Sequence, residues 1–141
     1  MTRKASAIWK GDLKSGKGTI STDSKVLSNT QYSFSARFEQ GAGTNPEELV
    51  AAAHAGCFAM ATSAQLGEAG ITAQSIEATA AVTLEKLESG FTVTSSHLTA
   101  TVRAPGSDRA KVETAVNNAK AGCPISKLLN AKITLDLKIE T

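Results

Sequence analysis

The side chains of this sequence that could take part in the widest range of reactions are its two cysteines, Cys57 and Cys123. Two cysteines among 141 residues are too few for a disulfide scaffold, and no apolar signal segment follows Met1. We therefore expect a cytoplasmic protein with reduced thiols, in which each cysteine either fills the core or takes part in redox chemistry.

Cys123 precedes Pro124 at the predicted start of a helix, where backbone N–H groups lower a thiol pKa, so local electrostatics favour it as the more reactive thiol. Cys57 lies in an alanine-rich segment and, on its own, is most economically explained as a core residue.

Other motifs do not support a nucleotide, metal or hydrolase site. Residues 11–17 match the first seven positions of a phosphate-binding P-loop, but Gly18 lacks the hydroxyl that reaches magnesium, and a strand rather than a helix follows. His54 and Cys57 share one helix face, yet two ligands do not make a zinc site, so we expect no metal. No Gly-x-Ser-x-Gly element marks a hydrolase nucleophile.

Charge and hydropathy argue against two further classes of partner. Fifteen basic and 13 acidic side chains give a net charge of +2, far from the basic stripe that a nucleic-acid backbone requires. The longest apolar stretch, residues 49–64, is built on alanine and interrupted by His54, Gly56 and Thr62. We predict that this stretch is too short and too weakly apolar to cross a membrane.

A well-marked helix start lies upstream of Cys57. Asn45 suits the N-cap, Pro46 suits the first helical position, and Glu48 follows the cap where a capping-box acid belongs. These signals predict a helix over residues 47–68. Alanine lies on nearly every face of this helix, which predicts a buried central position.

Alternating apolar residues predict strands on both sides of that helix. In a strand over residues 32–38, Arg37 would point away from the aromatic face. A second main helix is expected between Ser107 and Gly122, a short one from Cys123, and a β-bulge at residues 95–96. This order predicts an α+β fold of antiparallel hairpins around two main helices, in a single domain over residues 1–141. The remaining predicted strands cover residues 3–10, 17–22, 76–84, 91–102 and 133–139.

Three motifs around these residues closely resemble the OsmC/Ohr superfamily of organic hydroperoxide reductases. They are T-N-P-E-E-L at residues 44–49, A-A-H-A-G-C-F at residues 52–58, and A-G-C-P-I-S at residues 121–126. The resemblance extends over essentially the whole chain, including W-K-G-D at residues 9–12. The G-C-P-I-S form is similar to the OsmC branch, because the Ohr branch usually has a tyrosine after that proline.

The resemblance implies a thiol-dependent peroxidase with four site residues. Cys57 would be the peroxidatic nucleophile that becomes a sulfenic acid, and Cys123 the resolving thiol that condenses with it to a Cys57–Cys123 disulfide. Arg37 and Glu47 would orient and activate Cys57, since a nearby cation favours a thiolate. The implied partners are an organic hydroperoxide and a lipoyl-type dithiol reductant, without a metal, flavin or haem cofactor.

The resemblance also implies an intertwined homodimer, and the motif spacing agrees with it. Glu47 and Cys57 are separated by about 15 Å along one continuous helix, a gap that a glutamate side chain cannot close. Glu47 would then serve the partner's Cys57, unless the helix is broken between the two residues. We expect Arg37 to come from the partner as well, and its own chain is the open alternative.

Two other functions stay open on the same fold. One is a non-catalytic protein that binds a hydrophobic small molecule or a metal between its subunits, and the other is a structural stress protein whose cysteines have no role. A low-pKa thiol and a peroxide-induced Cys57–Cys123 disulfide would distinguish the peroxidase from both.

Overall fold

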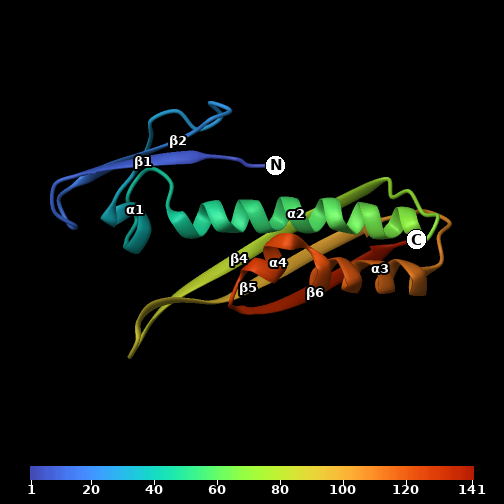
Figure 1. The fold of residues 1–141 in the computed structure, drawn as a ribbon. Coiled ribbons are helices and arrows are strands. Elements are labelled where there is room, and N and C mark those ends of the chain that lie inside the picture. Colours follow the sequence, from blue (N-terminus) through green and yellow to red (C-terminus); the bar gives the residue numbers. More distant parts are fainter. The chain divides into compact units, whose positions relative to one another are not determined.

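The computed structural model describes residues 1–141, which group into two compact units, Met1–Leu49 (unit 1) and Val50–Thr141 (unit 2) (Figure 1). Helix α2 starts in unit 1 and continues through unit 2. The predicted α+β class is confirmed, and the expectation of a single domain stays a prediction. The elements are β1 (Ala5–Lys10), β2 (Lys17–Thr22), β3 (Thr30–Tyr32), α1 (Phe34–Phe38), α2 (Pro46–Glu68), β4 (Ser75–Leu87), β5 (Gly90–Arg103), α3 (Arg109–Gly122), α4 (Pro124–Leu128) and β6 (Lys132–Glu140).

Unit 1 is built on a three-stranded antiparallel sheet in the order β1-β2-β3. The predicted hairpin over residues 3–10 and 17–22 is confirmed. Its loop is closed by Asp12, whose carboxylate accepts hydrogen bonds from the backbone N–H and the hydroxyl of Ser15. Gly18 lies where a Cβ would collide with the rings of Trp9 and Tyr32, so the small residue permits these two rings to pack 5.5 Å apart. The loop therefore forms a hairpin turn, as expected, and not a P-loop.

The segment after β3 is a helix, and the prediction of a strand over residues 32–38 is wrong. Ser33 ends the strand as the N-cap of α1, because its hydroxyl accepts a hydrogen bond from the backbone N–H of Ala36 at 3.2 Å. Phe34 and Phe38 then lie on one helix face with ring centroids 4.8 Å apart. Arg37 does not point away from the aromatic side chains, since its guanidinium lies 5.2 Å from the ring centre of Phe38.

Helix α2 begins as its sequence predicts. The Asn45 side-chain oxygen accepts the backbone N–H of Glu48 at 2.8 Å, and Pro46 occupies the first helical position. The Glu48 carboxylate accepts a hydrogen bond from the Thr44 hydroxyl at 2.6 Å, which ties the helix to the preceding loop. The expectation of burial on nearly every side is not met by the single chain. A stripe of small residues and Met60 is exposed, and the buried residues lie on one face: His54, Phe58, Thr62 and Leu66.

The length and apolar composition of α2 suffice for a membrane span, contrary to the expectation from residues 49–64. The helix has 23 residues and a mean hydropathy of 1.3 over its most apolar window. Its buried face nevertheless includes polar His54, whose ring is hydrogen-bonded within unit 2, and packs in the hydrophobic core through Phe58 and Leu66. These contacts place one face of α2 in the core of unit 2.

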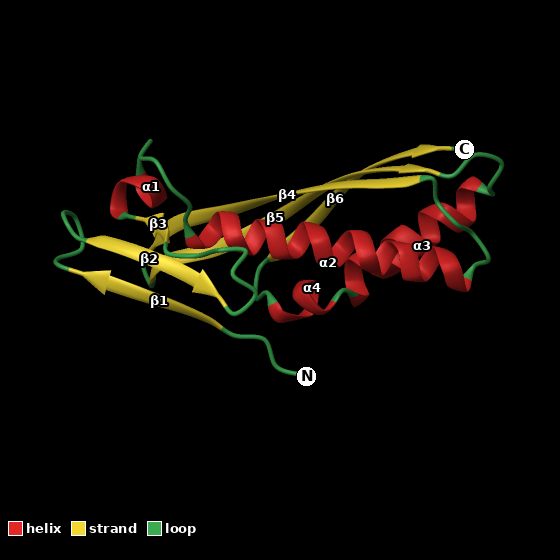
Figure 2. Ribbon diagram, turned by 90° about the horizontal axis from the view of Figure 1, so that it is seen from above, coloured by secondary structure: helices red, strands yellow, loops and turns green.

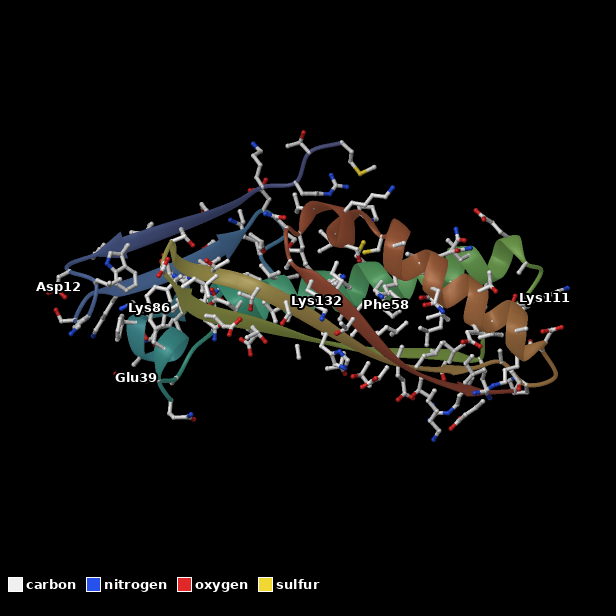
Figure 3. The ribbon with its side chains drawn as sticks, turned by 90° about the horizontal axis from the view of Figure 1, so that it is seen from below. Asp12, Glu39, Phe58, Lys86, Lys111 and Lys132 are labelled. Carbon is white, nitrogen blue, oxygen red and sulfur yellow. The ribbon has the colours of Figure 1, made fainter.

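The sheet of unit 2 has the strand order β4-β5-β6. Strands β4 and β5 form the predicted antiparallel hairpin, with Thr94 as the extra residue of a bulge, one position before the predicted 95–96. Strand β6 pairs parallel with β5 after the crossover through α3 and α4, a departure from the all-antiparallel expectation. Helices α3 and α4 and the part of α2 within unit 2 lie along one side of this sheet (Figure 2). Alternate β5 residues Leu98, Ala100 and Val102 are buried with Phe58, which Figure 3 marks inside this core.

Candidate active site

The two cysteines, distant in sequence, meet in unit 2. Cys57 is half-buried on α2, and Cys123 is fully buried at the junction where α3 ends and α4 begins. Both are free thiols, and their sulfur atoms share a hydrogen bond of 2.8 Å. Pro124 occupies the first position of α4, so the chain turns sharply and presents the Cys123 sulfur to α2. This separation permits a disulfide to form with little movement of the backbone.

The two thiols differ in their tendency to ionise. Burial, followed by the hydrogen bond to Cys123, raises the pKa of the Cys57 thiol above its ordinary value. Burial also opposes ionisation of Cys123, but interactions with Cys57, Ser126 and Ile125 together lower the pKa of the Cys123 thiol. Within one chain, Cys123 is therefore the thiol that ionises more readily, as its place at a helix start predicts.

A buried histidine lies beside the thiol pair. His54 precedes Cys57 by one helical turn, and its ring is fully buried. One ring nitrogen, Nδ1, shares a hydrogen bond of 2.7 Å with the Ser96 hydroxyl on β5, and the other, Nε2, shares one of 2.8 Å with the Ser126 hydroxyl on α4. Burial lowers the pKa of His54, so the ring is neutral near pH 7. Both nitrogens are occupied, and no group of three or more His, Cys, Asp or Glu side chains is placed to hold a metal ion.

Sequence reasoning did not single out Ser96 or Ser126. A usable signal was present for Ser126, which lies one helical turn after Cys123 and inside the motif at residues 121–126. Ser96 has no comparable local signal, because its position opposite the α2 face depends on how β5 pairs in the sheet. Both ring nitrogens of His54 have a hydroxyl partner, so the hydrogen-bonding capacity of this buried side chain is satisfied.

Arg37 and Glu47 form the second pair of predicted site residues, in unit 1. The Arg37 guanidinium donates three hydrogen bonds to the Glu47 carboxylate, two from Nε at 3.2 Å and one from Nη2 at 2.8 Å. The Glu47 side chain is only 12% exposed, whereas that of Arg37 is 36% exposed. The carboxylate thus holds the guanidinium in one orientation while the cation stays accessible.

An apolar hollow of about 230 Å³ lies next to Arg37 in unit 1. Half of the residues in its wall are aromatic, and the guanidinium of Arg37 supplies a polar group at its side. Such a combination suits a small ligand with an apolar body and one polar end. The wall includes Trp9, Leu13, Tyr32, Phe34, Phe38 and Pro46.

Helix α2 runs without interruption from Pro46 to Glu68. Glu47 and Cys57 therefore lie about 15 Å apart along its axis, and the alternative of a helix broken between them is wrong. The structure joins the predicted residues as two pairs, Cys57 with Cys123 and Arg37 with Glu47.

Known proteins share both the sequence and the fold of this chain. A model of the family described as OsmC-like protein matches residues 39–138. The chain belongs to the OsmC-like family. This OsmC-like protein is 50% identical over 139 residues to peroxiredoxin OsmC of Escherichia coli (strain K12), covering 99% of this chain and 97% of the relative.

A second relative of this OsmC-like protein is the organic hydroperoxide resistance protein OhrB of Bacillus subtilis (strain 168). The two are 32% identical over 124 residues, which cover 87% of this chain and 89% of OhrB. The crystal structure of the Bacillus subtilis OhrB superposes with a TM-score of 0.69, covering 96% of this chain and 98% of that chain. The higher identity to OsmC than to OhrB agrees with the branch that the motifs resemble.

Proposed function

We propose that this OsmC-like protein is a cysteine-based peroxidase that reduces organic hydroperoxides to alcohols. The observation that carries the proposal is the pair of free thiols, Cys57 and Cys123, with sulfur atoms 2.8 Å apart. Relatives over nearly the full chain are named peroxiredoxin and organic hydroperoxide resistance protein, which supports this chemistry.

The reaction proceeds through two bond exchanges. The Cys57 thiolate attacks the distal oxygen of the hydroperoxide, the O–O bond breaks, and the alkoxide leaves as an alcohol after taking up a proton. Cys57 is then a sulfenic acid. The Cys123 sulfur attacks the Cys57 sulfur, hydroxide leaves and takes up a proton to become water, and a Cys57–Cys123 disulfide remains. A dithiol of the lipoyl type reduces this disulfide by exchange and closes the cycle.

The first step needs a cation near Cys57, because burial raises the pKa of this thiol within the single chain. A guanidinium within about 4–6 Å lowers a thiol pKa by roughly 1–3 units. We infer that the partner's Arg37 supplies this charge in a homodimer and that the partner's Glu47 fixes its orientation. The separation of Glu47 from Cys57 along the unbroken α2 of one chain supports an arrangement across two chains.

The exposed face of α2 suits a second copy of this chain. It is formed by small residues and one flexible apolar side chain, that of Met60, which is 77% exposed. Small side chains let a second helix backbone approach closely, and an apolar helix face of this kind is stabilised when it is covered. The residues of this face are Ala52, Ala53, Gly56, Met60 and Ala64.

The apolar hollow beside Arg37 is suited to the organic group of the substrate. Its aromatic wall would favour an alkyl or aryl hydroperoxide over hydrogen peroxide, since the latter buries no apolar surface. We place the reaction in the cytoplasm, where dithiol reductants keep thiols reduced.

The test is consumption of tert-butyl or cumene hydroperoxide by the purified protein with dihydrolipoamide as reductant. The wild-type protein should turn over, Cys57→Ser should be inactive, and Cys123→Ser should reduce about one equivalent and stop as a sulfenic acid. Turnover retained in Cys57→Ser would refute the proposal. A protein that binds hydrophobic molecules without catalysis would form no Cys57–Cys123 disulfide when peroxide is added.

A further inference from the structure

The peroxidase chemistry proposed above leaves one buried polar group without a role. His54 is fully buried and spans from β5 to α4 through two hydroxyl groups, Ser96 and Ser126. Removing a histidine from water is unfavourable unless both nitrogens are hydrogen-bonded, and a hydrophobic residue would fill the same space without this requirement. The arrangement therefore points to a function beyond packing.

The Ser126 hydroxyl, which shares a hydrogen bond with His54, also interacts with the sulfur of Cys123, the proposed resolving thiol. Ser126 is in the first turn of α4, of which Cys123 is the N-cap. In the thiol form, Cys123 donates its S–H to Cys57 and makes no cap hydrogen bond. When Cys123 loses its proton, its sulfur becomes an acceptor, and the hydroxyl and backbone N–H of Ser126 stabilise the anion.

The tautomer of the neutral His54 ring determines which way the Ser126 hydroxyl points. A neutral ring has one donor and one acceptor nitrogen. With the proton on Nε2, His54 donates to the Ser126 oxygen, while Nδ1 accepts from the Ser96 hydroxyl. The Ser126 proton is then free to point at the Cys123 sulfur.

We propose that His54 is a positioning residue for the resolving step, acting through Ser126 on the Cys123 sulfur. Held between Ser96 and Ser126, the ring directs the Ser126 hydroxyl toward the Cys123 thiolate. That thiolate attacks the sulfenic sulfur of Cys57, the S–O bond breaks, and hydroxide leaves as water after taking up a proton. The inference rests on the proposed peroxidase function and assigns residues to its second step only.

The first experiment titrates the Cys123 thiol in the Cys57→Ser background, by thiolate absorbance and by the rate of iodoacetamide alkylation. Adding Ser126→Ala or His54→Asn should raise the pKa of Cys123 by about one unit, because the directed hydroxyl is lost. Adding His54→Gln should leave the pKa nearly unchanged, since a glutamine amide reaches the position of Nε2 and can donate to Ser126, which the shorter asparagine cannot. This titration involves no peroxide, so its result does not depend on the proposed function.

The second experiment follows a single turnover with cumene hydroperoxide by rapid quenching with N-ethylmaleimide and mass analysis. Ser126→Ala should keep the rate of peroxide consumption within twofold and slow disulfide formation about tenfold, in proportion to the lost thiolate. Thr62→Val is the matched control, because Thr62 is buried on the same face of α2 but its hydroxyl makes no hydrogen bond to His54, Ser96 or Ser126. It should change neither rate.

The proposal is overturned if Ser126→Ala leaves both the Cys123 pKa and the rate of disulfide formation unchanged, or if it slows both steps equally. The proposal is also overturned if His54→Asn leaves the Cys123 pKa where it is in His54→Gln. If His54→Asn does not fold, Ser96→Ala tests the ring in its place, because it removes the hydroxyl partner of Nδ1, and an unchanged Cys123 pKa in that variant contradicts the proposal. A wild-type protein that consumes no hydroperoxide contradicts the proposed function, whereas the titration still reports on the His54–Ser126–Cys123 chain.

Discussion

Arg37 donates to both carboxylate oxygens of Glu47, ten positions along the chain, from a short helix that the aromatic pattern of the sequence does not reveal. Because Glu47 is in the first turn of α2, the anion is favoured there by the helix N-terminus as well as by the guanidinium. The pair is thus a fixed cation that is presented at the edge of an apolar hollow.

Replacing Arg37 should slow the peroxide-reducing step specifically. In Arg37→Ala we expect kcat/KM for cumene hydroperoxide to fall about 100-fold, since a lost pKa shift of two units lowers the thiolate fraction by that factor. Arg37→Lys should recover little of this loss, because lysine cannot make the bidentate contact with Glu47. The exposed Arg3→Ala serves as the control of equal charge and should retain wild-type kinetics.

Mixed dimers should reveal which chain supplies Arg37. Cys57→Ser chains, which are inactive alone, and Arg37→Ala chains, which keep about one hundredth of the activity, are refolded together in equal amounts. If the partner's Arg37 activates Cys57, half of the dimers contain one complete site of two, and about a quarter of the wild-type activity returns. Activity that stays at background would show that Cys57 and Arg37 of one chain act together. A mixture of wild-type and doubly substituted chains controls for subunit exchange.

The buried His54 predicts a loss of stability in mild acid. Its folded-state pKa is lowered by burial from an ordinary value near 6.5, so the unfolded chain binds a proton at a higher pH than the folded chain. The free energy of unfolding should therefore decline as the pH falls below about 6.5, by at most about 1.4 kcal/mol per pH unit. Urea unfolding between pH 7.5 and 5 measures this. The decline should be smaller in His54→Gln, whereas equal pH profiles would contradict neutral burial of His54.

Thr62 offers a stabilising substitution. Its hydroxyl is buried without a hydrogen-bond partner, which costs free energy in the folded state. Thr62→Val keeps the shape of the side chain and removes the hydroxyl, so we expect the free energy of unfolding to rise by about 1 kcal/mol. Thr62→Ser keeps the hydroxyl and loses a methyl group, so it should be less stable than the wild type. Urea unfolding at pH 7.5 measures the free energy of unfolding of both variants.

Local sequence determined the start of α2 and the hairpin of unit 1. The N-cap, the proline and the acid of α2 interact within a few residues of one another, so Asn45, Pro46 and Glu48 specify the helix without help from the rest of the chain. The error at residues 32–38 has a local cause as well. Apolar residues at positions 34, 36 and 38 fit the alternation of a strand, and those at 34 and 38 also fit the spacing of one helical turn. The N-cap hydrogen bond of Ser33 favours the helix.

The motifs around Cys57 and Cys123 indicated the family and the four candidate site residues from sequence alone, whereas tertiary structure decided how those residues meet. The parallel pairing of β6 with β5, and the contacts of His54 with Ser96 and Ser126, join segments that are distant in the chain. Such contacts follow from the packing of α2 and α4 against the sheet, and no spacing in the sequence encodes them. The approach of the two sulfur atoms depends on the same packing, because Cys57 lies on α2 and Cys123 lies at the junction of α3 and α4, and the core sets the distance between these elements.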